Sequence, residues 1–352
     1  MKILTLTLMI LISGLTVGCY NKIELEERRF AGVLTVDLVE EGFSLGVDSL
    51  NISKDKSSEG DEKAVARKTG ENFTAAMGAL KDASSKIISF GLSKVVIFGE
   101  DLLKDNDRLS EAVFALEKNN ETSGKMLVMA AKGEAAGILK NHAEKEISLG
   151  YYISKYYKHA RGKHTSSYMM ELETLAETLR EGGGALIPLI SFEEESKAFA
   201  FSGAALINGC LAGFAEDEEL HGLSWVKGLG RGRLLHLKTD QDPAALKISG
   251  QRANVGFYED EGLVCHIRIN ASGELEEYSA LEDGRIYELE RLFAELILKE
   301  IKETHLFLAS FGIDGYDLEE RFYKKKPKLH RAYGGLPGSY DMDISVAVRI
   351  NN

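Results

Sequence analysis

Cys19 is the residue of this sequence with the clearest chemical potential, because it stands where the chain changes character. The run from Ile3 to Val17 is almost wholly apolar and follows Lys2, whereas charged residues crowd the stretch after Cys19. A membrane-spanning helix needs about 20 apolar residues, so this shorter run is typical of a signal peptide. Gly18 directly before the cysteine completes the pattern of a bacterial lipoprotein signal. A thiolate is nucleophilic enough to take up a diacylglyceryl group as a thioether. We therefore predict that residues 1–18 are removed and that Cys19 is lipidated as the first residue of the mature chain.

The alternative for this segment is a hydrophobic N-terminal strand that carries an ordinary cysteine. A half-buried strand would alternate apolar and polar side chains, and residues 3–17 do not alternate. The position of the run behind Lys2 at the start of the chain favours the signal peptide.

Two other segments invite an enzymatic interpretation. His159 and His164 lie in the basic cluster KYYKHARGKH, residues 155–164, but no further acidic or cysteine ligand stands at a spacing typical of a metal site. This cluster is more typical of a solvated loop or a contact face. The run GLGRGRL at 228–234 lacks the spacing of a phosphate-binding loop and does not clearly open a helix after a strand. Its glycines favour a tight turn.

Ser202 and the acidic run EDEE at 216–219 are candidates for a catalytic nucleophile and a calcium site. Ser202 lacks the glycine two residues earlier that a nucleophile elbow requires. The acidic run lacks the interleaved Asp/Asn and glycine pattern of a calcium loop, which favours a solvated loop. We therefore predict no catalytic, cofactor-binding or metal-binding residue in the mature chain, and a protein that is not an enzyme.

Composition narrows the function classes further. The chain has 43 basic and 55 acidic residues, a balance that argues against a nucleic-acid partner and against attraction to anionic lipid. Attachment to a membrane would therefore depend on the lipid at Cys19. The mature chain would keep 334 of the 352 residues, enough for two or three domains. Cys210 and Cys265 could form a disulfide, but both lie in apolar, strand-like runs and are expected to be buried free thiols.

The first region of the mature chain has the element order of an α/β domain. We expect a hairpin around Glu40-Glu41-Gly42 and then a helix over residues 64–86. A strand at 94–99, a helix at 105–119 and a strand at 125–131 should follow.

The second region is expected to be α+β. Two apolar runs flank Asn208-Gly209, a dipeptide typical of a two-residue type I′ hairpin turn. The stretch GLVCHIRI at 262–269 alternates as a half-buried strand does. A long amphipathic helix is predicted over 285–310, with Gly312 suited to end it, and an alternating strand at 340–350 closes the chain.

These regions predict the domain organisation. The breaks EGGGALIP at 181–188 and EEESK at 193–197 suggest a boundary shortly before Phe199. We expect a signal peptide over 1–18, an α/β domain over 19–192 and an α+β domain over 198–352. The predicted fold is thus multi-domain, with mixed sheets packed against helices.

Several segments of the sequence resemble a known family. The segments GCYNKIELEERRFAGVLTVDL, SKVVIFGEDL, GAALINGCLAGF and RFYKKKPKLHRAY occur in the order seen in the Ger(x)C family of spore germination lipoproteins. The resemblance covers nearly the whole mature chain, and the order of the segments carries it. Leu92 is a departure, because members of the family often carry a histidine there.

The resemblance implies a non-enzymatic role. Ger(x)C proteins are the C subunits of nutrient germinant receptors, anchored by lipid on the outer face of the spore inner membrane, where they act with polytopic A-type and B-type subunits to trigger germination. Two alternatives remain open. An extracytoplasmic solute-binding lipoprotein would need two similar lobes that close on a ligand, and an exported hydrolase would need a triad or metal cluster.

Overall fold

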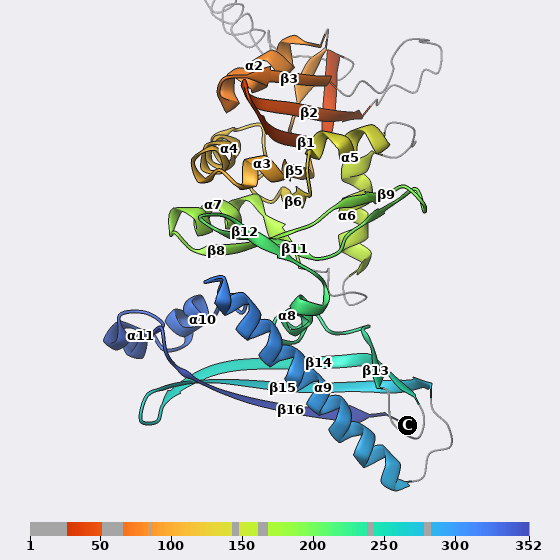
Figure 1. Cartoon of the computed structure of the whole chain (residues 1–352), viewed down its shortest axis with the longest axis vertical. Helices are drawn as coiled ribbons and strands as arrows, with labels where there is room; N and C mark the ends of the chain where they lie inside the picture. Colours follow the sequence, from red (N-terminus) through yellow and green to blue (C-terminus); the bar gives the residue numbers. More distant parts are fainter. Residues whose placement is uncertain are drawn as a thin grey trace, which may run out of the picture.

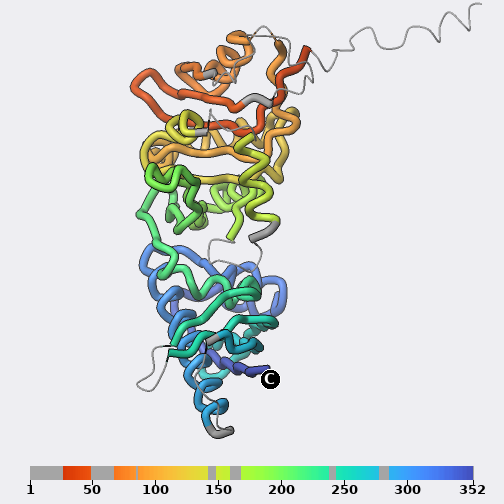
Figure 2. Tube along the Cα trace, turned by 90° about the vertical axis from the view of Figure 1, so that its right-hand side faces the viewer, coloured from red at the N-terminus to blue at the C-terminus, as the bar shows by residue number. Residues whose placement is uncertain are grey.

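The fold is taken from a computed structural model, which describes residues 27–50, 66–84, 86–142, 148–160, 168–237, 243–277 and 283–351. Two regions follow one another along the long axis of the molecule (Figures 1 and 2). The N-terminal elements lie at one end and the last strand lies near the other.

The N-terminal region is built on a seven-stranded mixed sheet. Its first two strands, β1 (Arg28–Val39) and β2 (Gly42–Leu50), form the predicted hairpin, with Val39 paired to Gly42. Gly42 has a φ of +118°, a conformation open to glycine because it has no Cβ. The hairpin prediction is therefore confirmed.

The helix predicted over residues 64–86 is wrong at both ends. Residues Ala66–Gly70 form the edge strand β3, which pairs with β2, and α2 covers only Phe73–Asp82. The helix begins there because the Asn72 side chain accepts a hydrogen bond from the Ala75 N–H at 2.8 Å. Residues 64 and 65 lie outside the described part of the chain.

The middle of this sheet is parallel. Strand β5 (Val95–Gly99) lies between β1 and β6 (Leu127–Ala131), while β4 (Ile87–Ser89) pairs with β1 and β7 (Met170–Glu171) with β6. All five residues of β5 are buried, as expected of a strand that is covered on both faces. The strands predicted at 94–99 and 125–131 are confirmed.

Helices cover both faces of the sheet. One face packs with α2, α4 and α7, and the other with α5 and α6. The predicted helix at 105–119 is confirmed as α4, which Asp105 caps through the N–H groups of the next turn. The helices of this region that follow α2 are α3 (Glu100–Leu103), α4 (Asn106–Lys118), α5 (Ala135–His142), α6 (Leu149–Ala160) and α7 (Leu172–Arg180).

A three-stranded sheet, which we call the small sheet, and a separate two-stranded sheet lie between the two ends of the molecule. Strand β11 (Ala204–Asn208) pairs with both β8 (Gly184–Pro188) and β12 (Cys210–Ala215), and β9 (Ser191–Glu193) pairs with β10 (Ala198–Ala200). The β8–β11 pairing therefore spans the break that the sequence suggested, and the domain limits stay a prediction.

The hairpin at Asn208-Gly209 is present, but its turn is not type I′. Asn208 is the last residue of β11 and pairs with Cys210, and only Gly209 takes a positive φ, +73°. The Asn208 side chain instead donates to the Phe311 carbonyl at 2.9 Å, beyond the end of the long helix. Asn208 thus links the small sheet to the C-terminal region.

The C-terminal region is a four-stranded sheet covered by a long helix, α9 (Figure 1). Leu289, Phe293, Ile297 and Ile301 of α9 are buried against this sheet. The predicted helix, the end marked by Gly312 (φ +69°) and the alternating strands are confirmed. The elements are β13 (Leu234–Leu237), β14 (Ala244–Glu259), β15 (Leu263–Glu277) and β16 (Asp341–Ile350), with η3 (Glu218–Leu220), α8 (His221–Val226), α9 (Asp283–Ser310), α10 (Leu318–Lys325) and α11 (Pro327–Tyr333).

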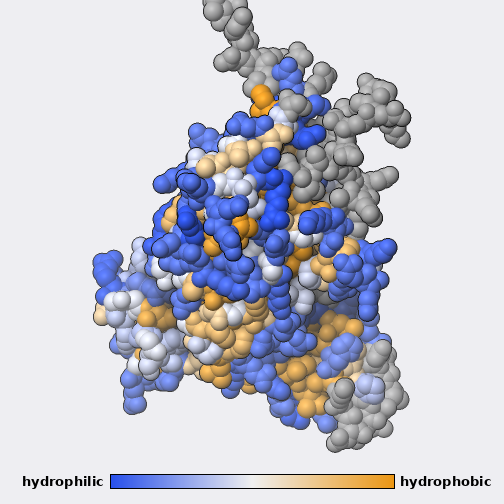
Figure 3. All heavy atoms as spheres, turned by 45° about the horizontal axis from the view of Figure 1, so that its top comes forward, coloured by the Kyte–Doolittle hydropathy of each residue, from blue (hydrophilic) through white to orange (hydrophobic). Residues whose placement is uncertain are grey.

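The predicted fold class, α/β followed by α+β with mixed sheets and helices, is confirmed. Hydrophilic side chains cover much of the face shown in Figure 3, with apolar areas between them. Within the part of the chain that is described, none of the helices combines the length and the apolar character needed to cross a bilayer.

Candidate functional site

The predicted lipidation site, Cys19, lies outside the described residues, so it stays a prediction. The side chains of His159 and His164 also lie outside them. The sequence suggested a solvated loop or a contact face for the basic cluster at 155–164, and the loop is wrong for its first part, since Lys155 and Lys158 lie on α6.

The glycine-rich run at 228–234 forms the predicted turn. Gly228, with a φ of +75°, follows α8, and the strand β13 begins at Leu234. A Cβ on Gly230 would lie 2.7 Å from the Trp225 ring, so this glycine allows the loop to pass close to the indole. These glycines therefore shape a packed turn that leads into a strand.

Two carboxylates of the acidic run at 216–219 accept hydrogen bonds from backbone N–H groups. Asp217 accepts the N–H of Gly203 at 2.8 Å, and Glu219 accepts the N–H of Glu216 at 2.8 Å. Among the described residues, no group of three or more His, Cys, Asp or Glu side chains is arranged to hold a metal ion.

The remaining candidates from the sequence do not come together. Ser202 is exposed, and Cys210 and Cys265 are both free thiols. Cys265 is buried as predicted, whereas Cys210 is only half-buried. Burial, with a smaller contribution from Asp314, raises the pKa of the Cys265 thiol to about 12, so it stays protonated at neutral pH.

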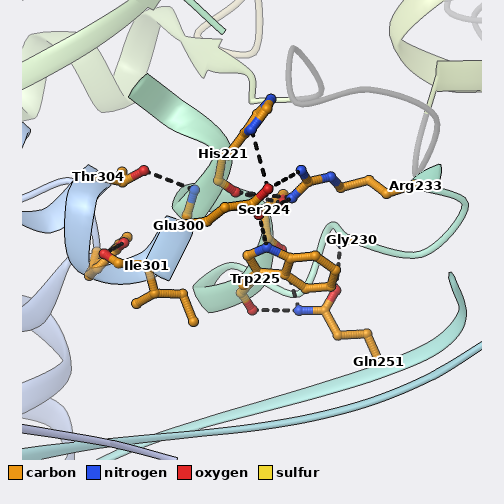
Figure 4. A network of polar contacts seen from close by, with 11 residues as sticks. His221, Ser224, Trp225, Gly230, Arg233, Gln251, Glu300, Ile301 and Thr304 are labelled. Atoms are coloured by element: carbon orange, nitrogen blue, oxygen red, sulfur yellow. Dashed lines mark hydrogen bonds and ion pairs between the residues drawn. The ribbon is translucent and has the colours of Figure 1, made fainter. Parts of the chain in front are cut away.

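A polar cluster lies in the C-terminal region around the Glu300 carboxylate of α9, which contacts side chains of α8 and the Arg233 side chain of the glycine-rich turn (Figure 4). We call this group the Glu300 cluster. Its side chains come from α8, the glycine-rich turn, β14 and α9. They are His221, Ser224, Trp225, Arg233, Gln251 and Glu300.

Both carboxylate oxygens of Glu300 are engaged. The guanidinium of Arg233 donates to them at 3.0 and 3.1 Å, a bidentate geometry that suits the planar fork of arginine. Trp225 Nε1 donates to Oε2 at 2.5 Å, and His221 Nδ1 lies 3.3 Å from Oε1. The Arg233 and Glu300 side chains are only 7% and 12% exposed. The pair is therefore a buried ion pair with its hydrogen bonds satisfied.

Further contacts tie this pair to the turn and the sheet. Arg233 also donates to Ser224 Oγ at 2.9 Å and lies over the Trp225 ring at 4.8 Å. Gln251 of β14 accepts the Gly230 N–H at 2.6 Å and donates to the Trp225 carbonyl. The cluster thus joins α9, α8, the turn and β14.

Electrostatics keep Glu300 ionised. Burial alone would raise its pKa, but the hydrogen bond with His221, the charge of Arg233 and the Trp225 N–H together hold the pKa below its usual value. A carboxylate with a lowered pKa and occupied oxygens is a poor general acid or base. What this arrangement does best is fix the position of α9 on the sheet.

Two buried aspartates organise the N-terminal region in a similar way. Asp37, at the carboxyl end of β1, accepts the N–H groups of Ala135 and Ala136 at 2.6 and 3.0 Å. Asp48 accepts the N–H of Leu149 at 3.0 Å, where α6 begins. The carboxyl edge of a parallel sheet is the usual place for ligands, and a helix start there often binds phosphate. Here the start of α5 is bound by Asp37 instead.

Sequence reasoning missed the Glu300 cluster. Arg233 is 67 residues from Glu300 and Trp225 is 75 residues away, so no local spacing reveals the contact. The available signal was a carboxylate and a threonine, Glu300 and Thr304, beside the apolar stripe of the predicted helix. Thr304 is buried and accepts the Gly222 N–H at 2.9 Å.

Comparison with known proteins identifies the family. Residues 21–192 match the family model described as spore germination protein N-terminal domain. Residues 202–352 match the model described as spore germination B3/GerAC like, C-terminal. The chain is 21% identical over 309 residues to spore germination protein B3 of Bacillus subtilis (strain 168), an alignment that covers 82% of this chain and 79% of that protein.

A solved structure agrees at the level of fold. The crystal structure of the GerBC protein matches with a TM-score of 0.60 and 18% identity, over 91% of this chain and 97% of that one. The two family models cover nearly all of the chain after Cys19, in the order that the sequence resemblance predicted. The chain therefore belongs to the Ger(x)C family of spore germination proteins.

Proposed function

We propose that this chain is the lipid-anchored C subunit of a spore nutrient germinant receptor. It acts with polytopic A-type and B-type subunits on the outer face of the spore inner membrane, and it carries no catalytic step. The observation that carries the proposal is the order of the two matched germination domains, the first of which begins two residues after Cys19.

Lipid anchoring follows from the chemistry at the border of the signal peptide. Two or three acyl chains on Cys19 would each contribute about 0.8 kcal/mol per buried methylene, and two chains suffice for stable anchoring. An acidic protein with 55 acidic and 43 basic residues has little attraction of its own for anionic lipid. The anchor would hold the domains beside membrane-embedded partners.

The non-catalytic role is supported by the closed character of the Glu300 cluster, whose donors and acceptors are engaged with one another. The solute-binding alternative would require two similar lobes. The two largest sheets differ, since one has a parallel centre and the other is an antiparallel meander with one parallel edge strand. No observation favours that alternative.

A complementation experiment tests the proposal. The gene is deleted in a strain that lacks other genes of this family, and the wild type, Cys19→Ala or Cys210→Ala is returned. Cys210 is a matched control, because it is another free thiol in the same chain. We measure acyl labelling, recovery in the spore inner-membrane fraction, and the loss of optical density after nutrient addition.

We expect Cys19→Ala to lose acyl labelling, to leave the membrane fraction and to slow nutrient germination, while the response to non-nutrient triggers stays intact. Cys210→Ala should behave as the wild type does. Equal labelling and membrane recovery of the Cys19→Ala protein would refute the lipoprotein assignment. Normal nutrient germination of the deletion strain would refute the receptor assignment.

A further inference from the structure

A basic hollow lies along α6, at the amino ends of the parallel strands. We call it the α6 hollow. It has two adjoining parts of about 320 and 600 Å³, which share Lys94, Ser154 and Lys158 in their walls. Volumes of this size are typical of small-molecule sites. The other described side chains that line it include Leu92, Lys125, Ser148, Tyr151, Lys155 and Tyr157.

The fold explains why these side chains meet. The Lys94 N–H donates to the Gly32 carbonyl at 3.1 Å and the Lys94 carbonyl accepts the Leu127 N–H at 2.9 Å, so the starts of β1, β5 and β6 lie in register. The start of α6 approaches closely, since a Cβ on Gly150 would lie 2.2 Å from the Gly32 carbonyl oxygen. One face of α6 then points along the hollow. Its residues there have helical spacing and are Tyr151, Ser154, Lys155 and Lys158.

The described side chains that line the α6 hollow carry positive charge, although the whole protein has more acidic than basic residues. Its four lysines are exposed, and none of them forms an ion pair with another residue that the structure describes. Lys155 lies over the Tyr151 ring at 5.2 Å. No acidic residue is among the described residues that line either part. The Asp48 carboxylate nearby is bound to the start of α6. Clustered ammonium groups repel one another, and an anion between them would relieve that repulsion.

Two buried hydroxyls in the wall supply an independent observation. Ser148 is 9% exposed and Tyr157 is 4% exposed, and their hydroxyl oxygens are the two buried side-chain polar atoms without a hydrogen-bond partner among the described residues. Burial, with smaller contributions from Tyr156 and Asp217, raises the pKa of Tyr157, so this hydroxyl keeps its proton and remains a donor. Buried polar groups are nearly always hydrogen-bonded, so two such hydroxyls on residues that line the same hollow call for an explanation, and a bound polar group would supply one.

We propose that the α6 hollow is a binding site for a phosphate group, held by Lys94 and Lys158, which line both of its parts, with Lys155 and Lys125 each lining one part. Lysine is a common phosphate ligand, because its ammonium group is a compact point charge with three rotatable donors. The phosphate could belong to a soluble phosphorylated molecule or to a lipid headgroup. The proposed binding is separate from the proposed receptor function. It is measured on the purified chain, so its failure would leave the receptor proposal untouched.

The test measures equilibrium binding to the full chain in a neutral detergent at low ionic strength, by calorimetry. The probes are inorganic phosphate, pyrophosphate, short-chain phosphatidylglycerol below its micelle concentration and short-chain phosphatidylcholine, a zwitterionic lipid with no net charge, as the control. Lys155→Gln/Lys158→Gln removes two charges from the hollow. Lys118→Gln/Lys302→Gln removes two exposed lysine charges from α4 and α9 and serves as the matched control.

We expect the hollow variant to weaken binding by at least about tenfold, since each charge-assisted hydrogen bond is worth roughly that factor, and the control variant to bind as the wild type does. Lys155→Arg/Lys158→Arg, which keeps the charge, should retain most of the affinity, and circular dichroism of each variant checks that its helices are folded. Preference for phosphate and pyrophosphate supports a soluble ligand, and preference for phosphatidylglycerol supports a headgroup. Absence of binding by every probe, or equal loss in the hollow and control variants, would overturn the proposal.

Discussion

Replacing Glu300 by alanine should destabilise the C-terminal region strongly. The change leaves the Arg233 guanidinium, only 7% exposed, without its carboxylate, and it removes the acceptor of the Trp225 N–H. Removing one partner of a buried ion pair costs about 3 to 5 kcal/mol, because the remaining charge is buried and uncompensated. That loss is a large part of the 5 to 15 kcal/mol that typically separates folded from unfolded states.

Urea unfolding measures this cost. With a slope of about 2 kcal/mol/M, a loss of about 4 kcal/mol lowers the midpoint by about 2 M. Trp225 is the single tryptophan of the chain and lies in the Glu300 cluster, so its fluorescence reports unfolding of this region. Circular dichroism provides a second signal that does not depend on the indole.

Glu303→Ala is the matched control on the same helix. The Glu303 side chain is 63% exposed and lies 3.7 Å from Lys299, so its loss should change the free energy of unfolding by less than about 0.5 kcal/mol. If Glu300→Ala and Glu303→Ala lowered the urea midpoint equally, the buried ion pair would not hold α9 in place, and the reasoning would fail.

The same residue should give a pH dependence. The pKa of Glu300 is lower in the folded chain than its usual value, so the stability that it adds is present above the unfolded pKa of about 4.3 and is lost as the pH falls through the folded pKa. Glu300→Gln cannot titrate. The difference in urea midpoint between the wild type and Glu300→Gln should therefore shrink as the pH is lowered from 7 toward 3, and a constant difference would contradict this assignment.

The remaining predictions concern caps and glycines. Asp37→Ala should lower the free energy of unfolding by about 2 kcal/mol, because two buried N–H groups lose their acceptor, whereas Asp101→Ala, at a side chain that is 76% exposed, should change it little. Gly209→Val should cost about 1 to 3 kcal/mol through its φ of +73°, since a Cβ there meets no neighbour within 4 Å. Gly78→Ala, in open space inside a helix, should stabilise by up to about 1 kcal/mol. Thermal and urea melts check all three. An unchanged midpoint for Asp37→Ala would contradict the hydrogen bonds of Asp37 to the start of α5, and an unchanged midpoint for Gly209→Val would contradict the positive φ of Gly209.

Local signals in the sequence predicted the elements that local physics decides. The 3.6-residue periodicity over 285–310 predicted α9, and the alternation over 340–350 predicted β16. The helix predicted over 64–86 failed because β3, Ala66–Gly70, is an edge strand whose residues show no apolar alternation. Its conformation comes from pairing with β2, and tertiary context of this kind overrides local propensity.

The turn at Asn208-Gly209 shows the same limit on a smaller scale. The dipeptide predicted the position of the hairpin, because glycine tolerates a positive φ. The predicted turn type, I′, is wrong, because Asn208 has no positive φ and its side chain donates to the Phe311 carbonyl 103 residues away. A contact with the far end of α9 thus selects a conformation in which Asn208 stays in its strand.

The α6 hollow could not be predicted for a related reason. Lys155 and Lys158 stand in a basic cluster that the sequence alone makes typical of a solvated surface. They indicate a binding site only in the folded chain, where the starts of β5 and β6 bring Lys94 and Lys125 to the same side of the sheet. Four lysines from three separate segments then surround one hollow, next to hydroxyls that have no partner among the described residues. The binding hypothesis therefore rests on the parallel pairing of the strands, which places these lysines together, and charge removal on α6 tests whether they bind an anion.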